Sequence, residues 1–212
     1  MAVRDIFDAV LDYEEDDVAE LVQAEIDAGT DVHSILQDGL VAPLDDIGER
    51  FSAGTLFVPE MLMAAEAVQA GLDILRPLLT ETGVKPIGTV VLGTVKGDLH
   101  DIGKNLVGLL LEGAGFRVID LGTDVGAEQF IASAQENDAD IIALSGLLTT
   151  SMPEMANAVA TLQDANKTRN LNVKVMVGGP PVHHEFAMKI GADAYGMDAP
   201  AAVERARSFF TG

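Results

Sequence analysis

A histidine between two carboxylates marks the segment of this sequence that is best suited to chemistry. His100 follows Asp98 by two residues and directly precedes Asp101, with Gly97 and Gly103 on either side. A histidine that binds a metal through one ring nitrogen usually donates its other N–H to a carboxylate or carbonyl oxygen, which fixes the tautomer and raises the basicity of the ring. Asp98 can supply that carboxylate. The alternative is a solvated loop histidine beside a helix start, where the helix dipole favours Asp101.

Two further segments are polar or rich in glycine. Ser145, Leu147 and Thr149 lie in the first, and the pair Gly178-Gly179 forms the second. Glycine allows the backbone to approach a bulky ligand closely or to adopt a positive φ, so the two segments indicate a site for a large ligand. Ordinary turn chemistry is the alternative.

Ser151 has two interpretations. It stands three residues before Glu154 and two before Pro153, which is the pattern of a capping box at a helix start. Capping is the favoured single role, and it leaves the hydroxyl able to meet Asp98.

The other candidate ligands favour no competing site. A zinc ion at His183 and His184 would lack an acidic ligand set beyond Glu185, and His33 lies among residues of helical pattern. The absence of cysteine excludes thiolate sites and disulfides. Neither a P-loop nor a nucleophile elbow is present.

Strands and helices must alternate to position these segments. The expected strands are 87–95, 116–120, 140–145, 172–177 and 192–195, and the expected helices are 103–114, 125–137, 152–166, 184–190 and 199–210. This alternation predicts a doubly wound, five-stranded parallel sheet of flavodoxin-like or Rossmann-like type. Ligands bind such sheets beyond the carboxyl ends of the strands. The three segments follow the first, third and fourth expected strands, so the fold should bring them together.

The preceding residues show helical periodicity and predict a small helical bundle, which places domain limits at 1–84 and 85–212. Pro43 should kink or split the helical segment that contains it. The charge distribution also separates the two parts. Residues 1–84 carry 3 basic and 19 acidic side chains, against 10 and 15 in residues 85–212.

The overall composition excludes several classes of partner. A net charge of −21 offers no basic excess for a nucleic-acid backbone. No apolar run approaches the roughly 20 residues that span a bilayer, and the amino terminus lacks a signal-peptide core. We therefore expect a cytoplasmic protein without nucleic-acid or membrane partners.

The motifs Asp98-x-His100-x-x-Gly103, Ser145-x-Leu147 and Gly178-Gly179, in this order and spacing, resemble the signature of the cobalamin-binding domain of methionine synthase and its relatives. The helical part resembles the bundle that precedes this domain in corrinoid methyltransferase proteins, notably at 39–43 and 49–60. The likeness covers nearly the whole chain.

This resemblance implies a role for each matching residue. His100 would be the lower axial ligand of cobalt in place of the cofactor's own benzimidazole, Asp98 would accept its N–H, and Ser151 would extend the relay. Phe51 and Val58 would cap the upper face of the cofactor, although Val58 stands where a larger leucine is common. The implied cofactor contacts are Gly97, Asp98, His100, Asp101, Ile102, Gly103, Ser145, Leu147, Thr149, Gly178, Gly179, Phe51 and Val58.

The resemblance further implies a corrinoid methyl carrier with methylcobalamin or a related corrinoid as cofactor. Such a protein accepts a methyl group from a substrate:corrinoid methyltransferase and passes it to a second methyltransferase that serves tetrahydrofolate or a thiol. A reductive activase is a further partner. The chain would be a subunit of a multi-component system, because 212 residues leave no room for a substrate-binding barrel.

Two related functions are alternatives. A cobalamin-dependent sensor or regulator would need a DNA-binding module, and the small subunit of an adenosylcobalamin mutase normally lacks the bundle. Methylamines, methanol, glycine betaine and methoxylated aromatics all remain open as methyl donors.

Overall fold

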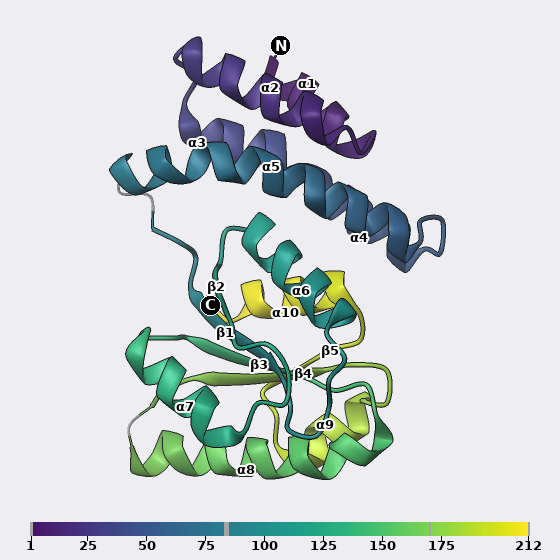
Figure 1. The fold of residues 1–212 in the computed structure, drawn as a ribbon, viewed down its shortest axis with the longest axis vertical. Coiled ribbons are helices and arrows are strands. Elements are labelled where there is room, and N and C mark those ends of the chain that lie inside the picture. The colour runs from purple at the N-terminus through teal and green to yellow at the C-terminus, as the bar shows by residue number, and fades with distance from the viewer. Residues whose placement is uncertain (1, 83–84, 170, 212) are drawn as a thin grey trace. The chain divides into compact units, whose positions relative to one another are not determined.

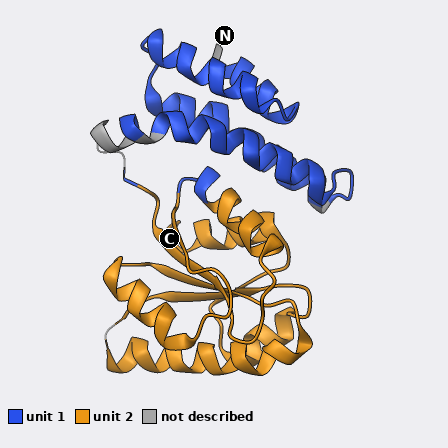
Figure 2. Cartoon of the chain, viewed as in Figure 1, with its two compact units in different colours: residues 1–85, 112–115 blue, residues 86–111, 116–212 orange. Residues whose placement is uncertain are grey.

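The computed structural model describes residues 2–82, 85–169 and 171–211 (Figure 1). The chain divides into two compact units, shown in blue and orange in Figure 2. Residues 1–85 and 112–115 form the helical unit, and residues 86–111 and 116–212 form the α/β unit. The limit expected between residues 84 and 85 falls beside residues 83–84, which lie outside the described residues. No helix in the described ranges has the length and apolar content to cross a membrane.

The helical unit has an aliphatic core. Ile6, Leu40 and Leu75 are among the side chains with no solvent exposure. The elements of this unit are α1 (Ala2–Leu11), α2 (Glu15–Asp27), α3 (Val32–Ser34), the π-helix η1 (Ile35–Val41), α4 (Ala42–Ser52) and α5 (Val58–Thr82).

The helix is interrupted next to Pro43, as its missing N–H predicts. The interruption is a π-helix that ends at Val41, where the Ala42 N–H donates to the Gln37 carbonyl five residues back. Pro43 is the second residue of α4 and has no N–H to continue this pattern of hydrogen bonds, so the π-helix ends directly ahead of it.

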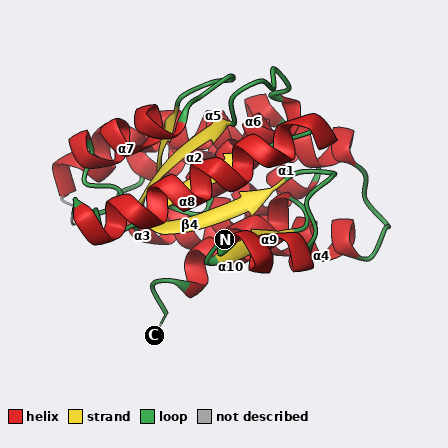
Figure 3. Ribbon diagram, turned by 90° about the horizontal axis from the view of Figure 1, so that it is seen from below, coloured by secondary structure: helices red, strands yellow, loops and turns green. Residues whose placement is uncertain are grey.

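The α/β unit contains a five-stranded sheet, in which every strand pairing is parallel and the order is β2-β1-β3-β4-β5. The strands are yellow in Figure 3, and Figure 1 shows α7, α8 and α9 on one face and α6 and α10 on the other. The strands are β1 (Thr89–Thr94), β2 (Arg117–Asp120), β3 (Ile141–Ser145), β4 (Lys174–Gly178) and β5 (Ala194–Gly196). The helices are α6 (Ile102–Gly113), α7 (Ala127–Glu136), α8 (Met152–Thr168), α9 (His184–Ile190) and α10 (Ala199–Ser208). The predicted fold class is confirmed.

The register of the sheet aligns the ends of three neighbouring strands. Thr94 of β1 pairs with Ser145 of β3, which pairs with Gly178 of β4. The strand order reverses between β1 and β3, because β1 connects through α6 to β2 on one side while β3 and β4 extend the sheet on the other. Such a switch point opens a crevice at the carboxyl ends of the strands. The three candidate segments begin at this crevice.

Candidate cofactor-binding site

The Asp98 carboxylate is the centre of the site, because its two oxygens connect the segments that follow β1 and β3. Oδ1 accepts from the His100 backbone N–H at 3.1 Å and lies 2.7 Å from His100 Nδ1. Oδ2 accepts from the N–H groups of Leu147 at 2.7 Å and Leu148 at 3.1 Å, and lies 3.0 Å from Ser151 Oγ. The Asp98 side chain is fully buried. The predicted convergence of Asp98, His100, Leu147 and Ser151 is therefore present in the structure.

These contacts keep Asp98 ionised and fix the tautomer of His100. Burial by itself raises the pKa of the Asp98 carboxyl, but the hydrogen bonds from the His100 ring and from the Leu147, His100 and Leu148 amides outweigh it and hold the pKa well below its usual range. An ionised carboxylate only accepts, so Nδ1 must carry a proton. In the neutral ring, Nε2 then presents its lone pair on the opposite side. The ring is half exposed, which leaves Nε2 suited to bind a metal.

Ser151 does not cap α8. It lies in the 3-10 turn η2 (Thr149–Ser151) with helical backbone angles, and its side chain makes no capping hydrogen bond. Its hydroxyl contacts the Leu148 carbonyl at 2.7 Å as well as Asp98 Oδ2. The capping interpretation is wrong because a capping side chain requires extended backbone angles, which the 3-10 turn prevents.

Backbone packing explains the glycine pair after β4. Gly179 has φ +120°, and a Cβ there would stand 2.0 Å from the Gly146 carbonyl oxygen. At Gly178 a Cβ would stand 3.0 Å from the Gly196 carbonyl oxygen. Both glycines therefore permit close approach of neighbouring backbone segments.

The glycines around the histidine differ from this pair. Gly97 has φ +81°, and in the described part of the chain no atom would come within 4 Å of a Cβ at Gly97 or Gly103. The surface beside the histidine is therefore open.

Large apolar side chains surround the exposed imidazole. Leu99 and Ile102, on either side of His100 in the sequence, are 74% and 76% exposed, and Leu147 and Leu148 are 41% and 38% exposed. Such a concentration of exposed apolar side chains indicates a surface for a ligand or partner. Asp101 and Thr149 are exposed and Ser145 is half-buried at the same end of the sheet.

The single available histidine nitrogen suits a metal whose other ligands come from its own cofactor. Within the described ranges no group of three or more histidine, cysteine or acidic side chains is placed to hold a metal ion. His100 can therefore supply a single axial nitrogen, as a metal in a macrocycle requires. The open glycines and the apolar side chains fit the wide ring of such a cofactor.

Several contacts of this site have little signal in the sequence. Leu148 acts through its backbone N–H, which every residue except proline carries. The Thr94 hydroxyl donates to the His100 carbonyl at 2.8 Å, and Thr94 is buried. The sequence signal for the Thr94 contact was a threonine at the end of an apolar strand.

The remaining predicted residues, Phe51 and Val58, lie in the helical unit. Phe51 is partly buried in α4, and Val58 is 48% exposed at the start of α5. His100 belongs to the other compact unit, so the role of these two residues stays a prediction.

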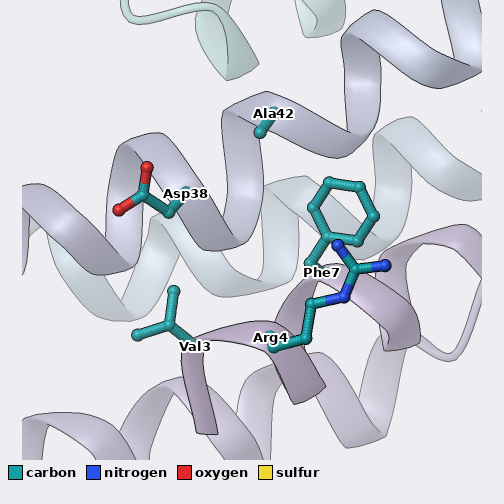
Figure 4. Close-up of a pocket in the computed structure, with 5 residues that line it drawn as sticks. All are labelled: Val3, Arg4, Phe7, Asp38 and Ala42. Atoms are coloured by element: carbon teal, nitrogen blue, oxygen red, sulfur yellow. The ribbon is translucent and has the colours of Figure 1, made fainter. Parts of the chain in front are cut away.

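The helical unit also has an open hollow of about 400 Å³ (Figure 4). The Arg4 guanidinium lies 4.1 Å from the centre of the Phe7 ring at this hollow. The residues that line it are Val3, Arg4, Phe7, Asp38 and Ala42. None of them is a predicted site residue.

Comparison with known proteins identifies the family. Residues 88–204 match the model of a B12 binding domain, and residues 2–76 match a second model of the same description. The chain belongs to the B12-binding family, and its cofactor is a cobalamin or related corrinoid.

Full-length relatives and solved structures agree with this assignment. A corrinoid protein of Desulfitobacterium hafniense is 44% identical, with 93% of this chain and 92% of the relative aligned. The trimethylamine corrinoid protein 1 of Methanosarcina acetivorans is 40% identical over 95% of this chain and 93% of its own. A chain of the methanol:cobalamin methyltransferase complex of Methanosarcina barkeri superposes with a TM-score of 0.83 at 31% identity, covering 100% of this chain and 80% of that chain.

Proposed function

We propose that this chain is the corrinoid methyl carrier of a methyltransferase system, with His100 as the lower axial ligand of cobalt. One observation carries the proposal: Asp98 fixes the Nδ1–H tautomer of a half-exposed imidazole at the switch point of the sheet. Curated relatives named as trimethylamine and dimethylamine corrinoid proteins support the methyl-transfer role.

The bound corrinoid supplies a cobalt that carries and releases a methyl group. The protein residues hold the imidazole and its proton. Asp98 orients the ring through Oδ1 and keeps the proton on Nδ1, and Ser151 connects the other carboxylate oxygen to the Leu148 carbonyl. The Ser151 hydroxyl has one proton and two acceptors within reach, so its rotation can strengthen or weaken the carboxylate's hold on the ring. His100, Asp98 and Ser151 are therefore connected by hydrogen bonds that can respond to a change in the charge of the imidazole ring.

The cofactor's contacts divide between its ring and its tail. Gly97, Asp101, Ile102 and Gly103 lie around the imidazole and are assigned to the corrin ring. The nucleotide tail is assigned to Ser145, Leu147, Thr149, Gly178 and Gly179. Residues 85–212 are thus the cofactor-binding domain, and residues 1–84 form a cap that shields the methyl-bearing face through Phe51 and Val58.

The partners follow from the division of labour in such a system. A substrate:corrinoid methyltransferase donates the methyl group, and a second methyltransferase transfers it to tetrahydrofolate or a thiol. A reductive activase restores oxidised cofactor. Methylated amines are the donors that the curated relatives name, so a methylamine:corrinoid methyltransferase is the first donor partner to test.

Reconstitution with hydroxocobalamin tests the axial ligand. After reduction to the paramagnetic cobalt state, protein labelled with ¹⁵N-histidine should show nitrogen hyperfine splitting in its electron paramagnetic resonance spectrum. His100→Ala should lose this splitting while retaining corrinoid through its other contacts. His184→Ala, an exposed histidine of the same unit, is the matched control. Failure of the wild-type protein to take up corrinoid, or an unchanged spectrum in His100→Ala, would reject the proposal.

A further inference from the structure

Asp124 holds the backbone of the turn that presents His100. It lies in the loop between β2 and α7 and adopts φ +58°. Its backbone N–H donates to the Asp98 carbonyl at 3.0 Å, and its Oδ1 accepts from the Gly97 N–H at 2.7 Å. One residue therefore binds the N–H of Gly97 and the carbonyl of Asp98, the two residues directly ahead of Leu99 and His100.

The loop that carries Asp124 is itself fixed to β1. The Thr94 N–H donates to the Gly122 carbonyl and the Val125 N–H donates to the Thr94 carbonyl, both at 2.9 Å. Val95 and Val125 form an isolated parallel bridge beyond the strand ends. Asp124 thus sits between two residues whose backbones are attached to the sheet.

Lys104 strengthens the same loop from α6. Its ammonium group pairs with Asp120, and its side chain is almost completely buried. Asp120 Oδ1 in turn accepts from the Gly122 N–H at 2.8 Å. The loop is therefore held at its beginning by an ion pair and at its end by the sheet, which makes it a rigid support for Asp124.

The His100 turn needs this support on one side. Leu147, Leu148 and Ser151 hold the Asp98 side chain from the β3 segment, but they do not restrain the backbone of Gly97. Gly97 has a positive φ and no side chain, so it has many alternative conformations that the turn must exclude. The Asp124 carboxylate is the side-chain contact that fixes its N–H.

We infer that Asp124 is a positioning residue for the axial imidazole: it sets the strength of cobalt ligation by His100 through the backbone of Gly97 and Asp98. This inference rests on the proposed function, and it assigns a role to a residue outside the proposed set of cofactor contacts. The loss of its side-chain bond should favour turn conformations in which the ring leaves the metal.

Three substitutions separate the two contributions of Asp124. Asp124→Asn keeps an oxygen acceptor and tolerates a positive φ, so it should behave like the wild type. Asp124→Gly keeps the backbone conformation and removes the acceptor, and Asp124→Ala removes both. Asp138→Ala is the matched control, because Asp138 has φ +49° in the turn after α7 and lies away from His100.

The measurement is competition between His100 and added cyanide for cobalt in hydroxocobalamin-loaded protein, followed by absorbance. In Asp124→Gly and Asp124→Ala the ratio of imidazole-ligated to displaced cofactor should fall about tenfold, equivalent to about 1.4 kcal/mol. Asp124→Asn and Asp138→Ala should stay within twofold of the wild type. Equal cyanide concentrations at half-displacement of the imidazole in all five proteins would overturn the inference. An equal fall of the ligation ratio in Asp138→Ala would also overturn it.

Hydrogen exchange in the cofactor-free protein gives a second readout. The Gly97 amide should exchange faster in Asp124→Gly and Asp124→Ala, and it should retain protection in Asp124→Asn. If wild-type protein shows no imidazole ligation, the proposed function fails, whereas the exchange experiment still reports whether Asp124 fixes the turn. An unchanged Gly97 exchange rate contradicts the positioning role in either case.

Discussion

The core of the helical unit is built from aliphatic side chains such as Ile6, Leu40 and Leu75, whereas the α/β unit also buries Asp98 and Lys104. Among the described residues, those with polar or charged side chains that are classed as buried all belong to the α/β unit: Thr89, Thr94, Asp98, Lys104, Ser133 and Ser151. Surface charge is distributed in the opposite way. Residues 1–84 carry a net charge of −16 (3 − 19) and residues 85–212 one of −5 (10 − 15).

This difference shows that the α/β unit buries polar side chains that position the candidate site, in addition to the apolar side chains that stabilise its fold. A buried polar group costs free energy unless it finds partners, so a purely apolar core is the simpler way to fold a small unit. The α/β unit buries Asp98 and Ser151 within one hydrogen-bonded network at the strand ends. The geometry of this network orients the His100 imidazole.

The comparison is tested most strongly by two glycines with positive φ. Gly179→Ala should cost more than about 4 kcal/mol in unfolding free energy, because the new Cβ would lie 2.0 Å from the Gly146 carbonyl oxygen at a φ that strains any side chain. Gly29 in the helical unit has φ +78°, and no atom of the described chain lies within 4 Å of a Cβ built there. Gly29→Ala should therefore cost only about 1 kcal/mol in unfolding free energy. Urea unfolding measures both. Similar losses for the two variants would show that backbone strain alone governs both sites.

The second prediction concerns Asp98 and pH. Asp98→Asn should destabilise the cofactor-free protein by about 2–3 kcal/mol at pH 7, because an amide replaces a charged acceptor beside the Leu147 and Leu148 N–H groups. The folded-state pKa of Asp98 lies below that of a free aspartate, so its contribution is complete above about pH 4 and is lost as pH falls further. The gap between wild type and variant should therefore narrow in acid.

Urea unfolding at several pH values between 7 and 3 measures this gap. Asp46→Asn is the control, since its carboxylate pairs with Arg50 on an exposed helix surface. A gap that stays constant down to pH 3 would show that Asp98 contributes through shape alone.

The sequence predicted the α/β unit because buried parallel strands and their covering helices have distinct patterns. Each expected strand and helix ends within two residues of the observed one. The strand-end rule then placed Asp98, His100 and Ser145 at one edge. The π-helix Ile35–Val41 was not predicted, because i to i−5 hydrogen bonding leaves no distinct periodicity over seven residues.

The parts of the site that were not predicted depend on backbone groups or on contacts between residues far apart in the sequence. The Leu148 N–H is a backbone group that nearly every residue type has, and the contact between Gly179 and Gly146 joins the loops after two different strands. The capping role expected for Ser151 was wrong because local capping chemistry matched the sequence, whereas the contact with Asp98 that the resemblance implied is present. Asp124 offered only its tolerance of positive φ as a signal.

A third prediction compares a buried ion pair with an exposed one. Lys104→Met keeps an apolar stem and removes the charge that meets Asp120, and it should cost about 1–3 kcal/mol. The Asp120 side chain is partly exposed, so water can solvate its carboxylate and the loss of stability is smaller than for a fully buried pair. Arg50→Met breaks an exposed pair with Asp46 on α4 and should cost less than about 1 kcal/mol. Thermal unfolding in low and high salt measures both effects. Salt should weaken the Arg50 contribution more, and the reverse order would contradict the contrast between the units.

The last prediction concerns Phe51, which the proposed function assigns to shielding of the cofactor. Phe51 is only partly buried, so Phe51→Ala should cost about 1–2 kcal/mol, less than a fully buried phenylalanine. Corrinoid affinity should not change, because the proposed axial ligand and tail contacts all lie in the α/β unit. If Phe51 shields the methyl-bearing face, the reduced holoprotein should oxidise several-fold faster in air. Val58→Ala should show a weaker form of the same effect, since it removes a smaller side chain.

Phe57 provides the matched control for this last experiment. It precedes α5 and is 66% exposed, so Phe57→Ala removes an equal aromatic group whose loss should change neither stability nor oxidation. Stopped-flow absorbance after mixing reduced protein with oxygen measures the rate in all four proteins. Faster oxidation in Phe51→Ala but not in Phe57→Ala would locate the shield on α4, because general loosening of the unit would not distinguish two phenylalanines by position. Equal rates throughout would remove the shielding role and leave the acidic helical unit as a surface for partner proteins.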